Sequence, residues 1–182
     1  MPNIPYLTDD DLAQGAAPVD LVSAVRARRG GKLLNLDRML LQSAPIARGW
    51  NTYMGSIRRD LKVSPVLREL AICAIAKLNR APYEWVQHAP EFLEVGGTQA
   101  KLDALQDIES AHTNSAAFDR AELATLKLAR EMSRNIEVSA ETMKEIRALL
   151  PNEQVVEIVA TIASYNMVSR FLVALGIDAD GE

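Results

Sequence analysis

Apolar residues between positions 65 and 78 recur at the spacing of one helix face, and this periodicity is the strongest constraint on the fold. They are Leu67, Leu70, Ala71, Ala74, Ile75 and Leu78. Such spacing is typical of a helix that buries one side. Ser64 and Pro65 start this helix, because a short polar residue caps the first turn and proline fits the first helical position. The step from Ala81 to Pro82 ends it, since the residue before proline avoids helical backbone.

The same signals predict helices along the rest of the chain. They cover roughly 18–29, 35–42, 43–60, 82–95, 98–108 and 118–134, with two more that begin at Ser139 and Pro151. Pro90 should kink or shorten the helix that contains it. No alternating strand pattern of useful length is present. The sequence therefore predicts an all-α, single-domain bundle of about eight helices over residues 18–182, preceded by an irregular N-terminal arm over residues 1–17.

The charge of the chain argues against a nucleic-acid partner. The formal net charge is -4, and an acidic protein binds nucleic acid poorly unless it has a concentrated basic patch. The one basic cluster is Arg26, Arg28, Arg29 and Lys32, at the end of the helix before two glycines. A phosphate site is possible there, but cations favour helix C-termini. We interpret this cluster as a solvated helix end.

The cysteine count and the apolar segments favour a cytoplasmic protein without a membrane span. There is one cysteine, Cys73, so an intrachain disulfide is excluded. The first residues lack the basic start and apolar core of a signal peptide. The longest apolar region, 155–175, is interrupted by Glu157, Ser164, Asn166 and Arg170, a polar load that membrane spans rarely carry.

Three proton-handling side chains lie in one predicted helix–turn–helix segment. Glu84 and His88 are four residues apart, so they share a helix face. Glu69 lies on the preceding helix and reaches His88 if the two helices pack as a hairpin. A carboxylate beside an imidazole fixes its tautomer, which suits the ring to proton transfer. The alternatives are a surface pair of Glu84 with His88, and a solvated Glu69 that pairs with Arg68 or Lys77.

This segment resembles the carboxymuconolactone decarboxylase and alkylhydroperoxidase D superfamily. The peroxidase members carry Glu, eleven residues, Cys, two residues, Cys, three residues and His. The same frame here holds Glu69, Ala81, Glu84 and His88, so the spacing is kept and both cysteines are missing. The segments YEWVQH and YNMVSRFLVALGI resemble sequences of a cysteine-poor branch of this superfamily that contains a YEW motif. The resemblance covers about residues 35–177.

The resemblance implies an all-α fold, assembly as a homotrimer or homohexamer, and catalysis without cofactor or metal. Without the dithiol, it implies a decarboxylase or related lyase or isomerase that acts on a small carboxylate or lactone, with Glu69, Glu84 and His88 as the catalytic residues. The alternatives are a peroxidase-related member and a catalytically silent oligomeric binding protein. A zinc or iron site made of the same three residues is chemically possible but does not fit the family.

Five further residues have two interpretations each. Tyr83 and Trp85 either line the substrate pocket or anchor the core. Asn166 and Arg170 share a face of the last helix and either hold a substrate carboxylate or carbonyl, or make structural and oligomer contacts, since a buried polar group needs a partner. Cys73 is either a reactive thiol or, as we expect from its place on the apolar face of its helix, a buried inert one.

Overall fold

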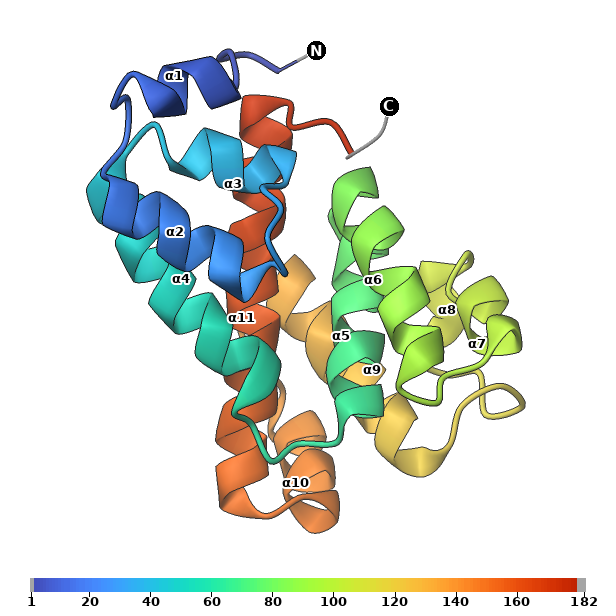
Figure 1. Ribbon diagram of the computed structural model, residues 1–182. Coiled ribbons are helices and arrows are strands. Elements are labelled where there is room, and N and C mark those ends of the chain that lie inside the picture. Colours follow the sequence, from blue (N-terminus) through green and yellow to red (C-terminus); the bar gives the residue numbers. More distant parts are fainter. Residues whose placement is uncertain (1, 180–182) are drawn as a thin grey trace. The chain divides into compact units, whose positions relative to one another are not determined.

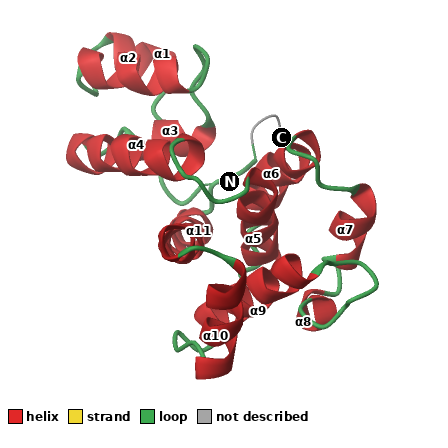
Figure 2. Ribbon diagram, turned by 90° about the horizontal axis from the view of Figure 1, so that it is seen from below, coloured by secondary structure: helices red, strands yellow, loops and turns green. Residues whose placement is uncertain are grey.

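Every regular element in the computed structural model, which describes residues 2–179, is a helix (Figure 1). The eleven helices of this part of the chain are α1 Asp9–Ala13, α2 Val19–Arg28, α3 Asn35–Leu40, α4 Ala44–Arg59, α5 Pro65–Leu78, α6 Pro82–Glu94, α7 Gln99–Ala104, α8 Ile108–Ala111, α9 Arg120–Arg134, α10 Ala140–Leu149 and α11 Asn152–Leu175. Figure 2, coloured by secondary structure, draws no strand over the same residues. The predicted all-α class is confirmed.

The described residues form two compact units, 2–60 with 172–179, and 61–171. The predicted boundary after residue 17 stays a prediction. That segment is not wholly irregular, however, because it contains the short helix α1. Thr8 caps α1, and the carboxylate of Asp11 in turn accepts a hydrogen bond from the backbone of Thr8. This reciprocal cap stabilises a helix too short for an apolar periodicity to reveal.

In the first unit, the basic cluster at the end of α2 is partly buried and not simply solvated. Arg28 and Arg29 both form ion pairs with the buried carboxylate of Asp37 on α3, at 3.1 Å each. Burial and the neighbouring charge of Arg29 lower the pKa of Arg28 to about 10. Asp37 thus ties the end of α2 to the start of α3, where it also accepts a hydrogen bond from the backbone of Leu34.

The second unit is organised around α5, which packs against α6, α9 and α8. Most of its side chains are buried, including Leu70, Ile72 and Ile75. The apolar positions of α5 continue around the helix beyond one face, which explains why several helices cover it. Figure 1 shows α5 and α6 side by side. This helical hairpin carries Glu69, Glu84 and His88.

Two local features of the second unit differ from the prediction. Helix α6 runs through Pro90 to Glu94 and is not shortened. Pro90 costs one hydrogen bond and crowds the carbonyl four residues earlier, but the helix continues beyond it. The helix expected over about 98–108 ends earlier, because α7 stops at Ala104 and a separate short helix, α8, begins at Ile108.

Helix α11 is long and apolar enough to cross a membrane by those two criteria alone. Half of its most apolar stretch is buried within the protein, as in the core helix of a soluble domain. Its buried residues include Ile158, Ile162 and Tyr165. The hydropathy of α11 is therefore weak grounds for a membrane span.

Candidate acid/base site

A tight turn between α5 and α6 brings the predicted catalytic residues onto one hairpin. Arg80 lies in the left-handed region, with φ of 53°. The backbone N–H of Ala81 donates to the carbonyl of Ala76 at 2.9 Å, and that of Asn79 donates to Ile75. These bonds close the last turn of α5 and reverse the chain. Pro82 then starts α6 in the first helical position, where its missing N–H costs nothing.

Glu69 and His88 meet across this hairpin. The Nδ1 atom of His88 lies 2.7 Å from Oε2 of Glu69, and the two residues are only 4% and 1% exposed. The other oxygen of Glu69, Oε1, accepts from Nε of Arg68 at 3.2 Å. A carboxylate only accepts hydrogen bonds, so Nδ1 of His88 is the donor in this contact. The predicted contact is present. Of the alternative, the pairing of Glu69 with Arg68 is also present, but Glu69 is buried and not solvated.

The ring of His88 is also fixed by an aromatic contact. Tyr165 of α11 meets it edge to face, with ring centroids 5.0 Å apart and planes at 89°. Such T-shaped contacts are favourable and set the ring plane. Together with the bond to Glu69, this contact holds Nε2 of His88 in a defined direction. Tyr165 belongs to the YNMVSR segment, but its contact with the histidine was not predicted.

Glu84 lies one turn before His88 on α6 and has a very different environment. It is 1% exposed, and within the described residues neither carboxyl oxygen has a hydrogen-bond partner. Burial raises the pKa of Glu84 well above its usual value. Burial therefore favours the neutral carboxylic acid form of this side chain. The alternative of a surface pair of Glu84 with His88 is wrong, because both residues are buried.

Cys73 is the only cysteine, and its surroundings oppose thiolate formation. It is fully buried on α5. Burial raises the pKa of its thiol, and the nearby carboxylates of Glu69 and Glu91 raise it further. Because the thiolate is the nucleophile in thiol chemistry, Cys73 is an inert core residue, as the sequence predicts.

A possible cation site overlaps the acid/base pair. Ligand atoms of Glu69, His88 and Glu91 all lie within 4.8 Å of one another. Nδ1 of His88 is 3.8 Å from the carboxylate of Glu91, which is 37% exposed. Two carboxylates and an imidazole suit zinc or iron, although Nδ1 would first have to release its proton. The sequence suggested Glu84 as the third ligand, whereas the structure brings Glu91 into this position.

The aromatic residues beside Glu84, Tyr83 and Trp85, lie in the protein interior or pack against it. Tyr83 is buried. Trp85 packs against the core cluster that includes Leu70 and Phe92, and Nζ of Lys77 lies 4.0 Å from the centre of its ring. These contacts fit the core-anchor interpretation. A role of Tyr83 and Trp85 in lining a substrate pocket stays a prediction.

Asn166 and Arg170 belong to a polar network on α11. The Nδ2 group of Asn166 donates to Oγ of Ser133 at 2.9 Å, and its Oδ1 accepts from Asn79 at 2.9 Å. Arg170 donates to the backbone carbonyl of Asn166 at 2.7 Å. This network links α9, α11 and the end of α5, as the structural interpretation expects. Contact of Asn166 or Arg170 with a substrate stays a prediction.

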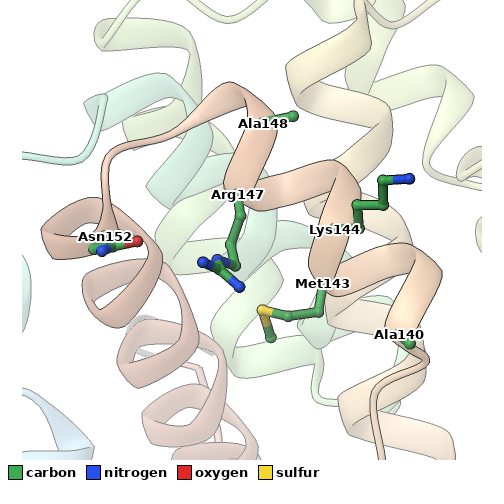
Figure 3. Close-up of a pocket in the computed structure, with 6 residues that line it drawn as sticks. All are labelled: Ala140, Met143, Lys144, Arg147, Ala148 and Asn152. Atoms are coloured by element: carbon green, nitrogen blue, oxygen red, sulfur yellow. The ribbon is translucent and has the colours of Figure 1, made fainter.

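A separate pocket of about 480 Å³ lies between α10 and the start of α11 (Figure 3). Its lining residues are Ala140, Met143, Lys144, Arg147, Ala148 and Asn152. Figure 3 shows the side chains of Met143 and Arg147 reaching toward the same space. The sequence did not indicate this pocket, because its lining has no recognisable motif. None of these six residues carries a carboxylate or imidazole for proton transfer.

Residues 44–131 match the carboxymuconolactone decarboxylase family. The matched range includes Glu69, Ala81, Glu84 and His88. No curated protein matches the chain.

Three solved structures share the fold over nearly the whole chain. The first is the alkylhydroperoxidase AhpD core of an uncharacterized peroxidase-related protein from Ralstonia eutropha JMP134, with 18% identity, TM-score 0.79, and coverage of 99% of this chain and 93% of that one. The second is an uncharacterized peroxidase-related protein from Silicibacter sp. TM1040, with 14% identity, TM-score 0.69, and coverage of 99% and 90%. The third is a cysteine-to-alanine variant of the debrominase Bmp8 in complex with 2,3,4-tribromopyrrole, with 18% identity, TM-score 0.75, and coverage of 97% and 90%. These likenesses establish the fold.

Proposed function

We propose that this chain, which belongs to the carboxymuconolactone decarboxylase family, is an acid/base enzyme that needs no cofactor. It acts on a small carboxylate or lactone as a decarboxylase or a related lyase or isomerase. The observation that carries the proposal is the buried hydrogen bond between Glu69 and His88. A buried imidazole held by a carboxylate is a proton-transfer unit that works near neutral pH.

In the proposed reaction, Nε2 of His88 takes a proton from a carbon atom next to a carbonyl group, or returns one to it. Glu69 holds the proton on Nδ1 and stabilises the imidazolium ion that forms, as the carboxylate does in other His–carboxylate pairs. Arg68 donates to the second oxygen of Glu69 and so favours the ionised carboxylate. The edge contact with Tyr165 keeps the ring in place during the proton transfer.

The alternative of a peroxidase is supported by the names of two structural relatives. A dithiol cycle, however, requires two thiols, of which one attacks as a thiolate. The chain has one cysteine, which is buried with a raised pKa. The positions of the two family cysteines hold Ala81 and Glu84. The chemistry of these residues therefore favours proton transfer over electron transfer.

Hydrogen exchange with the solvent tests the proposal even while the substrate is unidentified. A panel of small lactones, keto acids and unsaturated carboxylic acids is incubated with the protein in D₂O, and deuterium incorporation and loss of CO₂ are followed by mass spectrometry. We expect at least one compound to react with the wild type and with Cys73→Ala, but not with His88→Ala. Consumption of an alkyl hydroperoxide by wild type, but not by Cys73→Ala, would favour the peroxidase. No reaction in either arm would favour a silent binding protein.

We also propose that the protein is cytoplasmic and assembles as a homotrimer or homohexamer. The first statement is supported by the single cysteine and the polar residues that interrupt the longest apolar region, and the second by the resemblance to the family. Sedimentation equilibrium tests the second, with an expected mass of three or six times that of one chain.

A further inference from the structure

Glu84 differs from the other buried carboxyl groups of residues 2–179, because it has no hydrogen-bond or ion-pair partner. The other three are all paired within the protein: Asp37 with Arg28 and Arg29, Glu69 with Arg68 and His88, and Glu122 with Lys101. Both oxygens of Glu84 are buried without a hydrogen bond. An unsatisfied buried polar group costs about 1–3 kcal/mol, whereas an apolar side chain of similar shape would avoid that cost. The fold therefore gains nothing from a carboxyl group at this position.

The surroundings of Glu84 favour an uncharged ligand group over a charged one. The charged and titratable groups of the same hairpin, besides Glu84, are Arg68, Glu69, Cys73, Lys77, Arg80, Tyr83, His88, Glu91 and Glu94. Glu69 carries the negative charge of the ion pair with Arg68, and Glu91 adds a second negative charge near His88. A charged group placed beside the buried Glu84 would lose its hydration without gaining an opposite charge, whereas a carbonyl oxygen only needs a hydrogen-bond donor. As a neutral acid, Glu84 offers one O–H donor in a dry environment, where a hydrogen bond is strong.

We propose that Glu84 is the general acid of this site and that it binds the carbonyl oxygen of the substrate through its O–H group. The inference rests on the proposed function and narrows the substrate class to small carbonyl compounds with an acidic C–H bond next to the carbonyl carbon. His88 and Glu84 share one face of α6, four residues apart. They can therefore act on adjacent atoms of one substrate.

The electrons and protons balance in this step. The C–H bond breaks, and its proton moves to Nε2 of His88. The electron pair of that bond forms a carbon–carbon double bond, and the π pair of the carbonyl moves onto the oxygen. The oxygen takes the proton of Glu84, which becomes a carboxylate beside the new imidazolium ion. The enol O–H then returns its proton to Glu84 while His88 returns a proton to the carbon, which exchanges the hydrogen with solvent or inverts the carbon centre without any oxidant or cofactor. In a substrate with a conjugated carbon–carbon double bond, the proton can instead add to the far end of the conjugated system, which gives an isomerisation.

Two substitutions separate this role from a structural one. Glu84→Met keeps a similar volume and removes the unpaired polar group, so we expect an unchanged or higher melting temperature with an exchange rate lower by about 10²–10⁴. Glu84→Gln keeps an N–H donor but has no proton to transfer, so it should fall between Glu84→Met and wild type. Glu122→Gln is the control, because it changes a buried carboxyl on α9 that already has a partner, and exchange should be kept.

The protonation state of Glu84 is tested directly by ¹³C NMR of protein labelled at the glutamate carboxyl carbons. The signal of Glu84 is the one that is lost in Glu84→Gln. We expect it at the position of a neutral acid at pH 7. An ionised Glu84 overturns this inference and leaves the proposed function intact. An active Glu84→Met variant, or one that loses its fold, also overturns it. Absence of exchange in the wild type overturns the inference and the proposed function together.

Discussion

Replacing Glu84 by glutamine should change how the free energy of unfolding depends on pH. Burial raises the pKa of Glu84 above its ordinary value of 4.5. Above this value the unfolded chain has lost the proton that the folded protein still holds. The folded state binds one more proton, so its stability falls as the pH rises. The stability associated with the protonated Glu84 is fully present below pH 4.5 and is lost as the pH rises through the pKa that Glu84 has in the folded protein.

The size of this effect follows from the linkage relation. One proton of difference corresponds to about 1.4 kcal/mol for each pH unit. Glutamine has a similar shape and also places an unpaired polar group at this position, but it does not titrate. Between about pH 5 and 7, the wild type should therefore lose stability relative to Glu84→Gln by about 1.4 kcal/mol per unit for as long as the folded protein keeps the proton.

Urea unfolding followed by circular dichroism measures this difference. The transitions are recorded at about pH 5, 6 and 7, at one ionic strength and one protein concentration, because salt and assembly both change apparent stability. The control is Glu122→Gln, which leaves Lys101 without its buried partner and should be less stable than wild type. Parallel plots of unfolding free energy against pH for wild type and Glu84→Gln would refute the neutral, buried Glu84.

Three further predictions concern neighbouring residues. Cys73→Ala should keep full turnover and cost about 1 kcal/mol of stability through lost packing, and native protein should resist alkylation of Cys73 by iodoacetamide until urea unfolds it. Glu69→Gln should lower the exchange rate about 10²-fold or more, because glutamine cannot stabilise the imidazolium ion of His88, and a smaller loss would show that Glu69 only positions the ring. Addition of EDTA should leave turnover unchanged, whereas a loss that zinc restores would indicate a metal bound by Glu69, His88 and Glu91.

The helices could be predicted where a capping residue or a proline indicates their first or last turn. Pro65 and Pro82 start α5 and α6, and both helices begin where the sequence indicates. The Glu69–His88 contact was also predictable, because a short turn between two helices brings facing residues together. Helix α1 was missed because its only signal is the cap formed by Thr8 and the acidic residues after it.

The electrostatic contrast within the site could not be predicted from the spacing of its residues. Glu69 and Glu84 are the same residue type on adjacent helices. Among residues 2–179, Glu69 has a partner on each carboxyl oxygen and Glu84 has none on either. That difference depends on which helices pack around each side chain. The polar network around Asn166 depends in the same way on Ser133 and Asn79, which are distant in sequence.

The most direct test of a proton-transfer site on this hairpin is the ratio of deuterium exchange rates catalysed by wild type and by His88→Ala, with any carbonyl compound that the D₂O panel identifies. We expect the wild type to be faster by about 10²–10⁴, with the same rate for Cys73→Ala as for wild type. A ratio near one would contradict the claim that His88 transfers the proton, and so would activity that disappears with Cys73.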